Sequence, residues 1–128
     1  MQISRVLTVL MILTFCATAQ AEIADVKYRG LIDLKSFTCT NTVSSFVNRV
    51  CYDKANSYML ILLKDTWYHY CEIDAGTVTA LLNAESVGRY YNANIKGTGK
   101  DGPFDCRTHR VPATEIQLSL GNSPHDRF

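Results

Sequence analysis

Three strand-like segments between residues 46 and 71 constrain this chain more than any other feature. They are residues 46–52, 58–63 and 66–71. Only short polar stretches separate them, and polar residues of this kind form turns. The middle segment is unbroken and apolar, which indicates a strand covered on both faces. Three strands joined by short turns predict an antiparallel β-meander.

Alternation along the first and third segments predicts which side chains share a face. In the first, Phe46, Val50 and Tyr52 are expected on one face, with Val47 and Cys51 on the other. In the third, the same rule separates two tyrosines from three other side chains. Tyr68 and Tyr70 are expected on one face, and Trp67, His69 and Cys71 on the other.

Helical spacing replaces alternation after residue 73. Asp74 is a predicted N-cap, and Ser86 is the predicted cap of a second, shorter helix. Apolar residues follow each cap at helical intervals: Val78, Leu81 and Leu82, then Val87, Tyr90, Tyr91 and Ile95. Gly97 after Lys96 is a stop signal. The expected fold is therefore α+β, a three-stranded antiparallel meander followed by two short helices packed on the sheet.

The flanking segments define the expected organisation. Residues 1–21 read as a signal peptide, with one positive charge, an apolar core at residues 6–15 and small-x-small cleavage patterns ending at Ala19 and Ala21. Cleavage after Ala21 is preferred. The expected product is exported, periplasmic or secreted, and has no membrane span. Residues 22–44 are expected to be an extended lead-in, residues 45–97 the α+β domain, and residues 98–128 an irregular tail.

The cysteines agree with export. Four would remain after cleavage, an even number that in an oxidising compartment predicts two disulfides. They are Cys39, Cys51, Cys71 and Cys106. Three connectivities are open, and we favour Cys51–Cys71 with Cys39–Cys106. No Cys-x-x-Cys pair is present, so neither a zinc site nor another metal or cofactor is expected.

The net charge of the mature chain does not indicate a class of binding partner. Without Arg5 in the leader, twelve basic residues balance twelve acidic ones, so the mature chain has no overall attraction for nucleic acid or anionic membranes. One stretch, residues 89–110, has five basic side chains against two acidic ones. It would form an anion-binding edge, or an ordinary solvated helix face that runs into a charged loop.

Residues 45–97 resemble the KTSC domain, a short module named for its occurrence at the C-terminus of some lysyl-tRNA synthetases. The resemblance rests on the order and spacing of four pieces: Val-Cys-Tyr-Asp at residues 50–53, Tyr-His-Tyr at 68–70, residues 81–92 and Ile-Lys at 95–96. Cys51 replaces a usual glycine and Ala75 a frequent proline. The resemblance implies a fold and no established activity, although RNA binding has been suggested for the family.

Two kinds of residue are candidates for ligand binding, the strand tyrosines and the basic or aromatic residues after residue 88. The candidates are Tyr68, Tyr70, Arg89, Tyr90, Lys96 and Arg107. Exposed strand aromatics can stack on ligands, although packing under the helices would occupy the same side chains. Ser86 is expected to cap a helix, and a Cys71–His69 nucleophile pair would require a free thiol.

These features favour a non-enzymatic binding module that takes an anionic ligand or a protein partner. A small exported enzyme is the alternative class, and it would use Cys71 with His69 or a carboxylate such as Glu85 or Asp53. Nucleic-acid binding is a third hypothesis, and export weakens it because an exported protein meets little RNA from its own cell.

Overall fold

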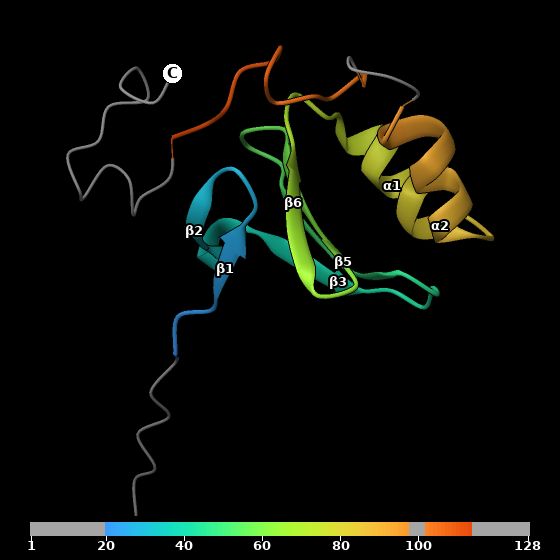
Figure 1. Ribbon diagram of the computed structural model, residues 1–128, viewed down its shortest axis with the longest axis horizontal. Helices are drawn as coiled ribbons and strands as arrows, with labels where there is room; N and C mark the ends of the chain where they lie inside the picture. Colours follow the sequence, from blue (N-terminus) through green and yellow to red (C-terminus); the bar gives the residue numbers. More distant parts are fainter. Residues whose placement is uncertain (1–19, 98–101, 114–128) are drawn as a thin grey trace, which may run out of the picture.

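The computed structural model describes residues 20–97 and 102–113 (Figure 1). Residues 1–19 of the expected signal peptide and residues 98–101 and 114–128 of the expected tail lie outside these ranges. Within them the strands are β1 (Ile23–Val26), β2 (Gly30–Asp33), β3 (Thr38–Asn41), β4 (Val47–Asp53), β5 (Tyr58–Leu63) and β6 (Thr66–Tyr70). The helices are a 3-10 turn η1 (Leu34–Ser36), α1 (Ala75–Asn83), α2 (Val87–Tyr90) and a π-helical turn η2 (Tyr91–Ile95).

The predicted meander is present as β4, β5 and β6, but it is only half of the sheet. The strand order is β2-β1-β6-β5-β4-β3, so the segment expected to be an extended lead-in supplies the other three strands. Each of those strands is only four residues long. Such short strands carry too little alternation to be detected from sequence. All pairs are antiparallel except β1 with β6, which is parallel.

The sheet must curl because its two outermost strands are neighbours in the sequence. Six strands spaced by roughly 4.8 Å would put β2 and β3 about 24 Å apart in a flat sheet. The five Cα-to-Cα steps from Asp33 to Thr38 span at most about 18 Å, and η1 shortens that reach. A hydrogen bond from the Leu34 amide to the Glu22 carbonyl, 2.9 Å, fixes the connection beside the start of β1.

Curling divides the buried side chains into two clusters, one on each face of the sheet. The cluster inside the curl contains Ala24, Val26, Ile32, Leu34, Cys51, Tyr58, Leu60 and Cys71. The cluster under the helices contains Val47, Val50, Met59, Ile61, Ile73, Val78, Leu81, Val87, Tyr91 and Ile95. Figure 1 shows the same division, with α1 and α2 on one side of β6 and β1 and β2 on the other.

One face assignment from the sequence is wrong. Val47 was expected beside Cys51, but it packs under the helices with Val50. The register shifts between Val47 and Arg49 in the β4–β5 ladder. A β-bulge of this kind inserts one residue and reverses the alternation on its far side.

The predicted helix signals are confirmed. The Asp74 carboxylate accepts a hydrogen bond from the Thr77 amide at 2.9 Å, and the Ser86 hydroxyl accepts one from the Arg89 amide at 3.3 Å. Gly97 ends the second helical stretch with a φ of 71°, in the left-handed region that glycine tolerates. Among the residues described, no helix combines the length and apolarity needed to cross a membrane.

Both disulfide pairings that we favoured are wrong. The structure pairs Cys39 with Cys51 and Cys71 with Cys106. Cys39 lies directly opposite Cys51 in the β3–β4 ladder. Cys51 is separated from the end of β6 by the whole of β5, which puts it about 10 Å from Cys71 across two strand spacings, too far for a disulfide.

Candidate functional site

The two strand tyrosines share the helix-facing side of β6, as predicted, but their environments differ. The Tyr70 and Tyr91 hydroxyls are 2.6 Å apart and hydrogen-bonded, and their rings meet edge to face with centroids 6.0 Å apart. Burial, together with the Tyr91 contact, raises the pKa of Tyr70. The Tyr70 side chain is therefore used in packing against the helices.

Tyr68 instead lies at the rim of the helix layer, where it lines an open hollow. The other lining residues are Ser45, Phe46, Leu63, Lys64, Asp65 and Thr66. The β5–β6 turn forms one wall, held by hydrogen bonds from the Lys64 amide to the Phe46 carbonyl and from the Asn48 side chain to the Lys64 carbonyl, both 2.8 Å. The hollow is therefore an apolar, partly aromatic surface with charged groups of both signs at its edge.

Two further residues extend this surface, and sequence reasoning missed both. Lys27 and Tyr28 lie in the turn between β1 and β2, and the Lys27 ammonium is 5.3 Å from the Tyr28 ring centre and 5.7 Å from that of Tyr68. These are cation–π distances. The parallel pairing of β1 with β6, with Val26 opposite Trp67, makes the contact. No local signal around Lys27 could have revealed a contact with a residue 41 positions away.

The Tyr28 backbone is unusual. Its φ is 66°, in the left-handed region that non-glycine residues rarely adopt, and its side chain is 87% exposed. Holding a bulky residue there costs on the order of 1 kcal/mol, while the exposed ring gains little burial in return. Ser57, Lys64 and Glu72 adopt the same left-handed backbone, so what distinguishes Tyr28 among these residues is its exposed aromatic ring.

The basic candidates do not gather at one place. Arg89 and Lys96 are exposed on the second helical stretch, and the Tyr90 ring is half-buried against the core. The Arg107 guanidinium pairs with Asp105, and this contact lowers the pKa of the Asp105 carboxyl. The expected anion-binding edge thus has one of its cations already paired, and Lys100 lies outside the described residues.

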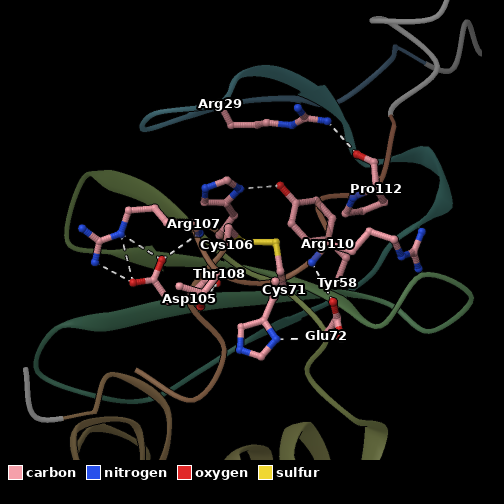
Figure 2. Close-up of a disulfide and its surroundings, with 12 residues drawn as sticks. Arg29, Tyr58, Cys71, Glu72, Asp105, Cys106, Arg107, Thr108, Arg110 and Pro112 are labelled. Carbon is pink, nitrogen blue, oxygen red and sulfur yellow. Dashed lines mark hydrogen bonds and ion pairs between the residues drawn. A yellow bond between two sulfur atoms is a disulfide. The ribbon is translucent and has the colours of Figure 1, made fainter. Parts of the chain in front are cut away.

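A second polar cluster surrounds the Cys71–Cys106 disulfide (Figure 2). Inside the curl of the sheet, the Tyr58 hydroxyl is 2.8 Å from His69 Nδ1, and their rings meet edge to face. Burial, with a further contribution from Arg29, lowers the pKa of His69 to about 4. The imidazole is therefore neutral at physiological pH.

Residues 102–113 cover this cluster and are fastened at several points, as Figure 2 shows for two of them. The Arg29 guanidinium donates to the Pro112 carbonyl at 2.6 Å, and the Arg110 amide donates to the Glu72 carboxylate at 2.6 Å. The Cys71 amide donates to the Phe104 carbonyl at 2.9 Å. The disulfide occupies Cys71, so in this form of the protein a Cys71–His69 nucleophile pair has no thiolate.

These features define a small α+β domain with a curled mixed sheet, two disulfides and helices on one face. Residues 43–98 match the family model of the KTSC domain, so this part of the chain is a KTSC domain, as the sequence resemblance implied. The match spans β4 to β6 and both helical stretches, and it excludes the first three strands and residues 102–113. Comparison with curated proteins and with solved structures found no match.

Proposed function

We propose that the protein is a non-enzymatic binding module and that its ligand occupies the hollow beside Tyr68, together with the adjoining turn at Lys27 and Tyr28. The observation that carries the proposal is the placement of the Lys27 ammonium within cation–π distance of both tyrosine rings. We call these three residues and the lining of the hollow the Tyr68 surface.

The chemistry of the Tyr68 surface favours a ligand with a flat or apolar body and an anionic group. Phe46, Leu63 and Tyr68 offer apolar contact, while Lys27 and Lys64 offer two cations against the single carboxylate of Asp65. Each ring contact is worth roughly 1–3 kcal/mol and an exposed ion pair up to about 1 kcal/mol. Two ring contacts and one ion pair therefore give at most about 7 kcal/mol, so we expect weak binding with a dissociation constant no lower than about 10 μM.

The proposal is tested by mapping a small aromatic anion, 8-anilinonaphthalene-1-sulfonate, on the isotope-labelled, disulfide-bonded protein by NMR. We expect the largest shifts at Phe46, Thr66 and Tyr68. Tyr68→Leu and Lys27→Ala should each weaken binding severalfold, with the fold checked by circular dichroism. The matched control removes two other exposed cations, Arg89→Ala with Lys96→Ala, and should leave the affinity unchanged.

Two outcomes would count against the Tyr68 surface. Shifts that cluster on the second helical stretch, with loss of binding in the Arg89→Ala and Lys96→Ala control, would move the site to the basic edge. A short single-stranded RNA that bound the same surface with higher affinity than the aromatic sulfonate would replace the small ligand by nucleic acid, since stacking aromatics and lysines serve that partner as well.

We also propose that the mature chain is exported and works in the periplasm or outside the cell. Two cysteine pairs at bonding positions support this, because structural disulfides persist in oxidising compartments. Mass spectrometry of native protein should find an N-terminus at Glu22, and thiol titration should find no free cysteine. A retained N-terminus together with four free thiols downstream of it would overturn the export proposal without affecting the Tyr68 surface.

A further inference from the structure

The fold brings together three potential metal ligands whose sequence positions give no indication of a site. An imidazole nitrogen of His69 and the sulfur atoms of Cys71 and Cys106 all lie within 4.8 Å of one another. His69 is on β6, Cys71 follows that strand, and Cys106 lies in the segment that covers the open side of the curl. Among the described residues, the other disulfide, Cys39–Cys51, belongs to no such group.

We propose that, when the Cys71–Cys106 disulfide is reduced, its two sulfurs and the His69 imidazole bind one thiophilic cation, with Cu⁺ preferred over Zn²⁺. Metal–sulfur bonds of about 2.3 Å and metal–nitrogen bonds of about 2.0 Å place ligand atoms roughly 3.5–4 Å apart. The present spacing needs a change of about 1 Å in the longest separation and a parting of the two sulfurs once their bond is broken.

The surroundings favour the lower-charged ion. Two thiolates with Cu⁺ leave a net charge of −1 at the site, whereas two thiolates with Zn²⁺ are neutral. The Arg29 guanidinium interacts electrostatically with both Tyr58 and His69, so a fixed positive charge acts on one of the three ligands. In a mostly buried setting that charge offsets an anionic complex. Thiolates are suitable ligands for both Cu⁺ and Zn²⁺, so the preference between the two ions rests on the charge at the site.

A water-soluble phosphine serves as the reductant of the Cys71–Cys106 disulfide. The phosphine takes one oxygen atom from water and becomes a phosphine oxide, while the S–S bond breaks and both sulfurs become thiols. Binding then forms two S–Cu bonds and one N–Cu bond, and the two thiol protons go to solvent.

The experiment uses the full chain with Cys16→Ser, Cys39→Ser and Cys51→Ser, so that Cys71 and Cys106 are the only cysteines that remain. The protein is reduced anaerobically, freed of phosphine, and titrated with Cu⁺ in competition with a chromophoric chelator, and then with Zn²⁺. We expect one Cu⁺ per chain, and a Cu⁺-to-Zn²⁺ preference that decreases in Arg29→Met. His69→Ala should weaken Cu⁺ binding by tenfold or more, whereas the matched control His109→Ala should have no effect.

Circular dichroism of the reduced, metal-free chain shows whether reduction by itself unfolds the protein. If reduction unfolds the chain, the proposal still requires that Cu⁺ restore the native spectrum in a way that depends on His69. Binding that is equally strong in His69→Ala, binding that survives Cys71→Ser with Cys106→Ser, or no binding at all would overturn it. None of these results bears on the Tyr68 surface, which is tested in the oxidised protein.

Discussion

Phe46 lies directly against the backbone of Gly88: a Cβ placed on Gly88 would be 2.6 Å from Phe46 Cε1. Real side chains do not approach so closely, so the contact exists only because residue 88 is glycine. It joins the segment that precedes β4 to α2, and it lets Phe46 pack edge to face on Tyr91 with ring centroids 6.1 Å apart.

Gly88→Ala is therefore expected to destabilise the domain although it favours the helix. Alanine gains roughly 0.5–1 kcal/mol of helix propensity over glycine. Forcing a methyl group into a packed contact costs about 1–3 kcal/mol. We expect a net loss of about 1 kcal/mol in the free energy of unfolding by urea. In a Phe46→Leu background, where the ring is gone, the same change should become neutral or stabilising. Equal effects in both backgrounds would show that the contact is unimportant.

The two disulfides should contribute different amounts to the free energy of unfolding. The loops that they close span 12 and 35 residues, which correspond to roughly 3 and 4 kcal/mol in the chain-entropy description. Cys71→Ala with Cys106→Ala should therefore cost more in urea than Cys39→Ala with Cys51→Ala.

Hydrogen exchange separates their local effects. Loss of Cys71–Cys106 should speed exchange at the Arg110 amide, which donates to Glu72, because the covering segment loses its covalent attachment. Loss of Cys39–Cys51 should leave that amide protected. Protection of the Arg110 amide that persists without Cys106 would show that hydrogen bonds alone hold the segment.

The hydroxyls of Tyr70 and Tyr91 should be energetically coupled. Each single change to phenylalanine leaves the partner hydroxyl without its bond in a mostly buried place, at a cost of about 1–2 kcal/mol. The double change leaves nothing unpaired, so the two effects should fall short of additivity by about 1 kcal/mol. Urea unfolding of the double-mutant cycle measures this, and Tyr90→Phe, at a half-buried ring, is the control. Strict additivity would contradict the coupling.

His69 should make the oxidised protein less stable in mild acid. Its pKa is lowered from 6.5 to about 4 in the folded state, so between these values the unfolded chain binds a proton that the native state does not. The contribution of His69 to the free energy of unfolding is complete above about pH 6.5. It decreases as the pH falls below that value and is lost as the pH falls through about 4. The upper bound of the loss is about 3 kcal/mol.

The measurement compares urea unfolding at pH 7 and pH 4.5 in the native sequence and in His69→Gln. The variant should lose less stability between the two pH values, whereas His109→Gln, whose imidazole is near the Glu72 carboxylate at the surface, should behave like the native sequence. An NMR titration that gave His69 an ordinary pKa would contradict the burial argument.

Local sequence signals determined the centre of this domain. The meander, the two helix caps at Asp74 and Ser86, and the separation of Tyr68 and Tyr70 from His69 and Cys71 all follow from interactions within a few residues. Alternation, capping and turn chemistry act at that range, so they can be read directly from the chain.

The tertiary structure decided what depends on distant pairing. The sequence did not reveal the curl of the sheet, the contact of Lys27 with Tyr68, the meeting of His69 with Cys106 or the partner of each cysteine. Each of these brings together residues 12 to 41 positions apart, through strand register or chain path. Register is a collective outcome of packing on both faces of the sheet, and no single segment contains enough information to specify it.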